Sequence, residues 1–205
     1  SPGRGLYAIT DRRLIPEAVL VERVGEAIDG GAAIIQYRDK SSGQATRLEQ
    51  AAALAALCSA RQVPLIINDD IELAAAVNAD GVHLGIDDAS VRTARAQLGE
   101  DAIIGVSCYN RLERAIEAVA AGADYVAFGR FFASKTKPNA VTADTDLLAA
   151  ARQQLRVPIV AIGGITPDNG AALIAAGADY LAAIDGVFGQ ADVYTAAQSY
   201  AALFA

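Results

Sequence analysis

The stretch LIINDDIELAAAVNADGVHLGIDD, residues 65–88, decides the fold. It opens with the apolar run LIIN (65–68), whose β-branched isoleucines favour a buried strand. The Ala-rich segment IELAAAVNA (71–79) then has helical spacing, and GVHL (81–84) is a second apolar run. A strand, a helix and a strand in this order require that the two strands run parallel.

Carboxylates follow both strands at the same end. Asp69 and Asp70 come after the first strand, and Asp87 and Asp88 come after the second. Carboxylates that converge there repel each other unless a cation or a salt-bridge partner lies between them. We expect Asp69 and Asp88 to hold Mg²⁺, which usually takes one or two carboxylates together with phosphate oxygens. The alternative is that these residues are helix N-caps and first-turn acids, and we assign Asp70 and Asp87 to that class.

The rest of the chain repeats the strand–helix pattern. Because the expected strands are continuous apolar runs, they are parallel and buried on both faces. Eight units in a chain of 205 residues predict one (β/α)8 TIM barrel, an all-parallel closed barrel that spans residues 1–205 as a single domain. A doubly wound sheet is the alternative. The expected strands are 6–10, 33–38, 65–68, 81–84, 102–107, 124–129, 158–164 and 179–184, and the expected helices include 17–29, 44–61, 89–98, 112–121, 142–155, 167–176 and 192–204.

One phrase recurs along the chain. Ala-Gly-Ala-Asp-Tyr appears at 121–125 and again at 176–180, and 78–81 is a looser copy. We interpret it as a helix end, a glycine cap and a strand start.

Composition narrows the class of partner. The net charge of −7 argues against nucleic acid as a ligand. No apolar run approaches the ~20 residues that span a membrane, so we expect no membrane partner. Cys58 and Cys108 have no motif spacing, which predicts two free thiols in a reducing cytoplasm. The sequence leaves open whether the chain forms a homo-oligomer.

The active site of such a barrel lies at the carboxyl ends of the strands. Basic residues gather there in an otherwise acidic chain, which indicates a small anionic ligand. Glycines 163 and 164, with the segment after the eighth strand, predict a phosphate grip. Together with Mg²⁺, the basic residues suit a diphosphate leaving group. The candidate residues from these strand ends are Gln36, Arg38, Lys40, Asn68, Asp69, Asp88, Ser107, Ser134, Thr136, Lys137, Gly164, Ile184 and Asp185.

At these residues the chain resembles the thiamine phosphate synthase family along nearly its whole length. The matching pieces are YAITD, QYRDK, LIINDD, DGVHLG with Asp88, GVS, DYVAFG with SKTKP, and VAIGGI. The resemblance implies that a 4-amino-2-methyl-5-hydroxymethylpyrimidine diphosphate is the donor and a 4-methyl-5-(2-phosphoethyl)thiazole is the acceptor. Thiamine phosphate and diphosphate would be the products of a Mg²⁺-assisted dissociative substitution.

The resemblance also implies a role for each matching residue. Asp69 and Asp88 would carry Mg²⁺, and Arg38, Lys40, Ser107 and Lys137 would be catalytic. The pyrimidine diphosphate would contact Gln36, Arg38, Lys40, Asn68, Ser107 and Lys137. The thiazole phosphate would contact Ser134, Thr136, Gly164, Ile184 and Asp185. The substrate-binding residues would also include Tyr37 and Asp39 of QYRDK and Lys135 of SKTKP. For Lys135, a solvated side chain is the alternative explanation.

Two residues depart from the family pattern. Ile86 stands where the family often has Gln, and Asp185 stands where a small Ser is common. Both bear on efficiency more than on the fold. We expect the Asp185 side chain to turn away from the phosphate and to leave only its backbone N–H, because a carboxylate there would repel the phosphate.

Three rival functions stay open. A thiazole tautomerase shares the barrel but typically has His at the position of Tyr109 and lacks much of the basic set. A non-catalytic barrel would bind thiazole phosphate or thiamine phosphate as a sensor without the metal pair. A sugar-phosphate isomerase or epimerase would need a catalytic acid and base but no diphosphate cluster.

Four other residues have structural explanations. We interpret His83 as a satisfied structural histidine, and Tyr125 and Tyr180 as residues that pack strand against helix. Cys108 lies beside Ser107, but no base that would activate it is evident.

Overall fold

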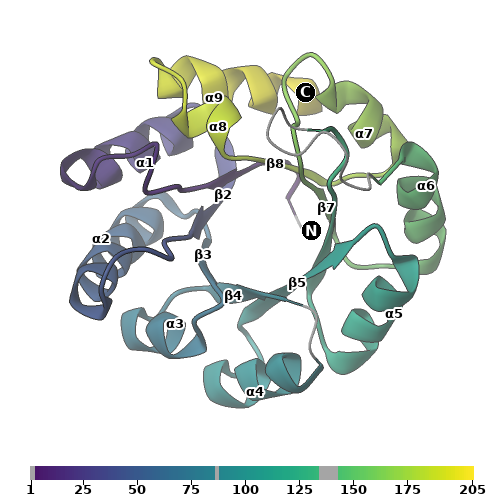
Figure 1. The fold of residues 1–205 in the computed structure, drawn as a ribbon, viewed down its shortest axis with the longest axis horizontal. Coiled ribbons are helices and arrows are strands. Elements are labelled where there is room, and N and C mark those ends of the chain that lie inside the picture. Colours follow the sequence, from purple (N-terminus) through teal and green to yellow (C-terminus); the bar gives the residue numbers. More distant parts are fainter. Residues whose placement is uncertain (1–2, 86–87, 134–142) are drawn as a thin grey trace.

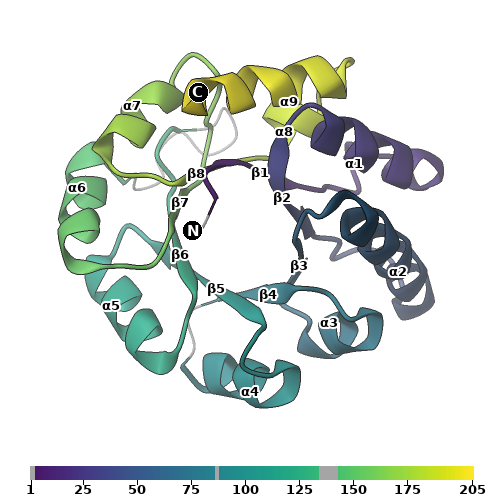
Figure 2. The same ribbon diagram turned by 180° about the vertical axis from the view of Figure 1, so that it is seen from behind.

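The computed structural model describes residues 3–85, 88–133 and 143–205. Its strands follow one another around a closed barrel in chain order, and all pairs are parallel. Figure 1 looks down the barrel, with the helices in a ring around the strands, and Figure 2 shows the same ring from behind. The predicted (β/α)8 barrel is therefore confirmed. The strands are β1 (Gly5–Ile9), β2 (Ala32–Tyr37), β3 (Leu65–Asn68), β4 (Gly81–Leu84), β5 (Ile103–Tyr109), β6 (Tyr125–Phe128), β7 (Ile159–Ala161) and β8 (Tyr180–Ala183).

The helices depart from the sequence expectation mainly at their ends. The helix expected at 17–29 begins as a 3-10 turn, η1 (Glu17–Val19), and the closing helix ends in another, η2 (Ala202–Phe204). A short helix after β8 was not expected at all. The α-helices are α1 (Leu20–Asp29), α2 (Gln44–Arg61), α3 (Ile71–Val77), α4 (Asp88–Leu98), α5 (Leu112–Ala121), α6 (Thr145–Gln154), α7 (Gly170–Ala176), α8 (Asp185–Phe188) and α9 (Val193–Ala201).

The strands bury their two faces in two separate cores. Alternate residues of a strand point to opposite faces, so in β3 Ile66 points into the barrel while Leu65 and Ile67 pack against the helices. The outer core is the larger one and holds the helices on the barrel. The inner core fills the barrel itself with Tyr7, Ile9, Ile34, Ile66, Tyr125, Ala127, Val160, Tyr180 and Ala182.

The interpretation of Tyr125 and Tyr180 as strand-to-helix packing is wrong. Both side chains belong to the inner core. Gly105 is the neighbour of Tyr125 in register, and a Cβ at Gly105 would collide with the Tyr125 ring. The glycine therefore makes room for a large ring to lie across the inside of the barrel.

The recurring Ala-Gly-Ala-Asp-Tyr phrase has a physical role at the amino ends of the strands. The glycine ends α5 at Gly122 and α7 at Gly177, both with positive φ. The aspartate that follows joins neighbouring strands, because its Oδ2 accepts a hydrogen bond from a backbone N–H at the start of the preceding strand, from its first or second residue. The three such contacts are Asp80 to Leu65 (2.7 Å), Asp124 to Ile104 (2.8 Å) and Asp179 to Ile159 (2.8 Å).

In the described part of the chain, no helix has both the length and the apolar character needed to cross a membrane.

Candidate functional site

A pocket of about 270 Å³ opens at the carboxyl ends of the strands, and we call it the mouth pocket. It brings together four polar residues that the sequence predicted for the substrate site, from β2, β3 and β5 and the loop after β2. Its lining residues are Tyr7, Ile9, Gln36, Arg38, Asn68, His83, Ser107, Tyr125, Ala127, Val160, Ile162, Ala182 and Ile184. The predicted residues among them are Gln36, Arg38, Asn68 and Ser107, together with Ile184.

Five of the polar side chains that line the mouth pocket form one continuous hydrogen-bonded chain. The Gln36 amide donates to the Tyr7 hydroxyl at 2.8 Å, and the two hydroxyls of Tyr7 and Tyr125 are 2.6 Å apart. The Tyr125 hydroxyl lies 2.8 Å from His83 Nδ1, and His83 Nε2 lies 2.7 Å from Ser107 Oγ. Five strands thus contribute one residue each to this chain, which we call the polar relay.

Burial keeps the titratable groups of the relay in their neutral forms. It lowers the pKa of His83 from 6.5 to about 4, against a smaller raising effect of the Asp69 charge. Burial likewise raises the pKa of Tyr7 to about 12, and it raises the pKa of Tyr125 well above 10. His83 has a partner at both ring nitrogens, which agrees with the expectation of a satisfied histidine.

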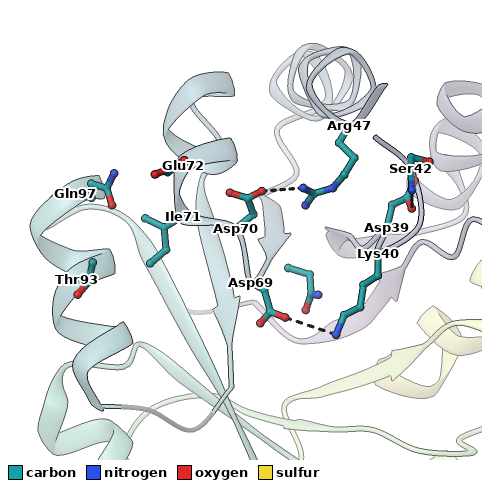
Figure 3. Close-up of a pocket in the computed structure, with 11 residues that line it drawn as sticks. Asp39, Lys40, Ser42, Arg47, Asp69, Asp70, Ile71, Glu72, Thr93 and Gln97 are labelled. Atoms are coloured by element: carbon teal, nitrogen blue, oxygen red, sulfur yellow. Dashed lines mark hydrogen bonds and ion pairs between the residues drawn. The ribbon is translucent and has the colours of Figure 1, made fainter. Parts of the chain in front are cut away.

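A second pocket of about 670 Å³ lies beside the mouth pocket, and we call it the charged pocket. Figure 3 shows Lys40 and Asp69 pointing toward each other, and Lys40 Nζ lies 3.7 Å from Asp69 Oδ2. Arg47 pairs with Asp70 at 2.9 Å in the same view. Asn68 lines both pockets, so the two spaces adjoin.

The four carboxylates that follow the two strands of the 65–88 stretch, Asp69, Asp70, Asp87 and Asp88, are placed differently by the structure. Asp70 is the N-cap of α3 and accepts from the backbone N–H of Leu73, which confirms its predicted structural role. Asp69 is exposed and has a positive φ of 61°. Asp88 is the first residue of α4, but its side chain lies outside the described part, as does the whole of Asp87.

Two residues of the QYRDK motif have their side chains occupied by the fold. The Tyr37 hydroxyl donates to Gln50 Oε1 at 2.6 Å, and the ring packs in the outer core between β2 and α2. Asp39 Oδ1 accepts from the backbone N–H groups of Ser41 and Ser42. Burial raises the pKa of the Asp39 carboxyl, but hydrogen bonds from Ser42 and Ser41 outweigh it and lower that pKa to about 2. Asp39 thus shapes the loop that carries Lys40.

A third pocket of about 420 Å³ lies on the other side of the mouth pocket, and we call it the glycine pocket. Gly163 and Gly164 have φ values of 107° and 67°, a region that favours glycine. The Asn169 side chain holds their loop, because it donates to the Gly164 carbonyl and accepts from the Thr166 N–H. Ile162, Ala182 and Ile184 line both this pocket and the mouth pocket.

Asp185 lines the glycine pocket at the first residue of α8. A Cβ at Gly189 would collide with its carboxylate, so the side chain lies over the end of its own short helix. Its backbone carbonyl accepts from the Gln190 side-chain amide at 3.1 Å.

Several predicted residues cannot be placed in this geometry. Ser134, Lys135, Thr136 and Lys137 lie outside the described residues, and so does Ile86. Their predicted roles stay predictions from the resemblance.

The two cysteines are free and buried. Burial raises the pKa of Cys58 and the pKa of Cys108 to about 12, so neither thiol supplies a thiolate nucleophile at neutral pH.

The sequence reasoning missed the relay roles of Tyr7, Tyr125 and His83. All three lie at inward-facing positions of their strands, next to Gln36 and Ser107. The signal that would have found them is a row of hydrogen-bonding side chains at inward positions of successive strands, since a buried polar group needs a partner.

Comparison with known proteins agrees with this geometry. A family model described as thiamine monophosphate synthase matches residues 6–187. The thiamine-phosphate synthase of Nitrosococcus oceani is 54% identical over 197 residues, which are 96% of this chain and 91% of that protein. The thiamine-phosphate synthase of Azoarcus sp. strain BH72 is 54% identical over 202 residues, 98% of both chains.

Among solved structures, a thiamine phosphate pyrophosphorylase from Pyrococcus furiosus has a TM-score of 0.86 and 36% sequence identity. The match covers 97% of this chain and 94% of that chain. These matches confirm the resemblance found in the sequence: the chain belongs to the thiamine monophosphate synthase family.

Proposed function

We propose that this chain joins 4-amino-2-methyl-5-hydroxymethylpyrimidine diphosphate to 4-methyl-5-(2-phosphoethyl)thiazole, forming thiamine phosphate and releasing diphosphate. Besides family membership, one structural observation supports the proposal. The mouth pocket adjoins the charged pocket through Asn68 and the glycine pocket through Ile162 and Ile184. Three adjoining spaces suit the pyrimidine ring, its diphosphate and the phosphate of the thiazole.

The mouth pocket takes the pyrimidine ring. Its walls are mostly apolar, with Gln36, Asn68 and Ser107 as uncharged polar groups along one side. Such a lining suits a flat aromatic ring whose edge carries hydrogen-bonding nitrogens.

Basic side chains take the diphosphate. Arg38 lines the mouth pocket and forms no salt bridge with any residue in the described ranges. Lys40 forms a salt bridge with Asp69 in the charged pocket. During the reaction the bond between the pyrimidine methylene carbon and the diphosphate oxygen breaks, and the electron pair leaves with diphosphate. The guanidinium and the ammonium stabilise the charge that grows on this leaving group.

The thiazole nitrogen then donates its lone pair to the methylene carbon, and the new C–N bond leaves thiazolium. This step needs no proton transfer, because the ring nitrogen carries no proton to lose. The titratable residues of the mouth pocket within the described ranges are Tyr7, Arg38, His83 and Tyr125. Since the pKa of His83 is about 4 and its nitrogens are both hydrogen-bonded, the pocket offers no strong base. That lining suits dissociative substitution better than the acid–base chemistry of a sugar-phosphate isomerase.

The carboxylates suit a magnesium ion that the substrate also ligates. Within the described residues no three His, Cys, Asp or Glu side chains form a closed metal cluster. Mg²⁺ does not need one, because it keeps several waters and binds through one or two carboxylates plus substrate phosphates. The exposed Asp69 carboxylate at the end of β3 fits that donor set, and Asp88, which follows β4, would be the second ligand. When bound, the ion would neutralise charge on the diphosphate.

The glycine pocket takes the phosphate of the thiazole. The backbone at Gly163 and Gly164 has no side chain to keep an oxyanion away. Gly164, Ile184 and Asp185 line this pocket. Ser134, Thr136 and Lys137 would join from the loop after β6, on the strength of the resemblance alone.

We also propose that the reaction takes place in the cytoplasm. The two thiols, Cys58 and Cys108, are free, which suits a reducing compartment.

An assay of diphosphate release tests the proposal. The protein should release diphosphate when both substrates and Mg²⁺ are present. Release should fall to background when the thiazole phosphate is omitted. A sensor would bind thiazole phosphate or thiamine phosphate tightly in calorimetry but would release no diphosphate. Saturable binding without turnover would therefore replace this proposal by the sensor.

A further inference from the structure

The polar relay runs across the inside of the barrel and ends on two groups that face the mouth pocket. Its members come from five strands: Tyr7 from β1, Gln36 from β2, His83 from β4, Ser107 from β5 and Tyr125 from β6. The His83 and Tyr125 rings stack with centroids 5.6 Å apart, above the space that Gly105 leaves open between their strands. Each residue holds its neighbour in place.

The donor at one end sets the direction of every hydrogen bond in the relay, provided that each tyrosine proton has an acceptor within the relay, as a buried polar group requires. Gln36 Nε2 donates to the Tyr7 oxygen. The proton of Tyr7 then goes to the Tyr125 oxygen 2.6 Å away, and the proton of Tyr125 goes to His83 Nδ1. A neutral imidazole has one N–H, so that N–H is at Nε2 and donates to Ser107 Oγ.

This assignment leaves the Ser107 hydroxyl proton unused by the relay, together with the side-chain carbonyl and the second amide N–H of Gln36. Ser107 accepts from His83, so its own proton remains to be donated. Gln36 uses its amide nitrogen on Tyr7, so its side-chain carbonyl remains as an acceptor. Both residues line the mouth pocket. The relay therefore fixes a donor at Ser107 and an acceptor at Gln36 on the wall of the pocket.

We propose that Tyr7, Tyr125 and His83 are positioning residues that hold Ser107 as a donor and Gln36 as an acceptor for the pyrimidine substrate. The inference rests on the proposed function only for the identity of the ligand. An aminopyrimidine offers ring nitrogens that accept and an exocyclic amine that donates, so a pocket with both polarities suits it. A pyrimidine with an oxo group in place of the amine would place its own acceptor against the Gln36 carbonyl, and the unmatched pair would lower the binding affinity.

The protonated nitrogen of His83 can be observed without any substrate. His83 is the only histidine in the chain, so ¹⁵N-labelled histidine gives one pair of imidazole signals that needs no further assignment. At neutral pH the spectrum should show the proton on Nε2. A proton on Nδ1, or protons on both nitrogens, would reverse the relay and overturn the proposal. This measurement tests the direction of the hydrogen bonds in the relay even if the protein proves to have another activity.

Kinetics with a matched pair of variants test the consequence. Tyr7→Phe removes a hydroxyl from the relay, whereas Tyr180→Phe removes a hydroxyl from the same inner core outside the relay. Tyr7→Phe should raise the KM for the pyrimidine diphosphate roughly five- to tenfold, the size of one hydrogen bond, and leave the KM for thiazole phosphate within about twofold. Tyr180→Phe should change neither KM.

Tyr125→Phe breaks the relay one step further on and replaces Tyr7→Phe if that variant does not fold. Equal changes in both KM values, or the same change in Tyr180→Phe, would mean that the hydroxyls only support the core and would overturn the positioning role.

Discussion

Lys40 Nζ lies 3.7 Å from Asp69 Oδ2, so the loop after β2 and the end of β3 meet through opposite charges. Both side chains are more than half exposed, at 63% and 56%, and an exposed pair of this kind contributes little to stability. Asp69 also has a positive φ, which a non-glycine residue adopts at some cost. A weak ion pair on a strained backbone is better explained by function than by folding.

We predict that Asp69→Ala raises the Mg²⁺ concentration needed for half-maximal rate at least tenfold, because a ligand is lost. EDTA should abolish turnover of the unaltered protein. Glu72→Ala is the matched control, since Glu72 is an exposed carboxylate of the charged pocket on α3, and it should leave the Mg²⁺ requirement unchanged. Full activity in EDTA, or equal effects of the two variants, would contradict the proposed Mg²⁺ site at Asp69.

The acidic residue in the glycine pocket gives a second prediction. The Asp185 carboxylate lies over the end of α8, near Gly189. We therefore expect Asp185→Ser to change the KM for thiazole phosphate by less than about threefold. A carboxylate about 5 Å from a phosphate would cost roughly 3 kcal/mol at an effective dielectric near 20. A KM that tightens tenfold or more in the variant would show that the carboxylate faces the phosphate.

The single histidine gives a prediction about pH and stability. The unfolded chain takes up a proton on His83 near pH 6.5, whereas burial lowers the pKa of His83 in the folded chain to about 4. Between these values the unfolded state binds more protons, so the free energy of unfolding falls as the pH falls. The contribution of His83 should be about 2 kcal/mol between pH 7 and pH 5.

Urea unfolding at several pH values measures this effect. His83→Gln removes the titrating group and should flatten the dependence over the same range, because the chain has no other histidine. A variant with the slope of the unaltered protein would show that other groups cause it.

The aspartates at the amino ends of the strands predict a stability effect away from the site. Asp124→Ala leaves the N–H of Ile104 without its partner and removes the ion pair with Arg95. We expect a loss of about 1–3 kcal/mol in the free energy of unfolding. Asp101→Ala, at an exposed position, should lose less than about 0.5 kcal/mol. Chemical denaturation compares the two, and similar losses would contradict the role of Asp124 in joining β5 to β6.

The sequence predicted the barrel well because its strands are short apolar runs with polar ends. LIIN and GVHL have the predicted bounds as β3 and β4. The sequence did not predict α8, because a helix of four residues is too short to show a helical period.

The sequence did not tell which face of a strand lines the barrel. In β6, Tyr125 and Val126 are both apolar enough for either face, and the prediction that Tyr125 faces the helices is wrong, because Val126 does so. The error has a physical cause, because in a parallel strand buried on both faces the alternation of polar and apolar residues disappears. The polar relay depends on that choice of face, so it became visible only when the strands were placed in register.

The most direct test of the central claim follows both products by ³¹P NMR in one reaction. With both substrates and Mg²⁺, diphosphate and thiamine phosphate should form in equal amounts as the pyrimidine diphosphate and the thiazole phosphate disappear together. Diphosphate release while the thiazole phosphate stays unchanged would identify a hydrolase and contradict the account, as would the absence of any reaction.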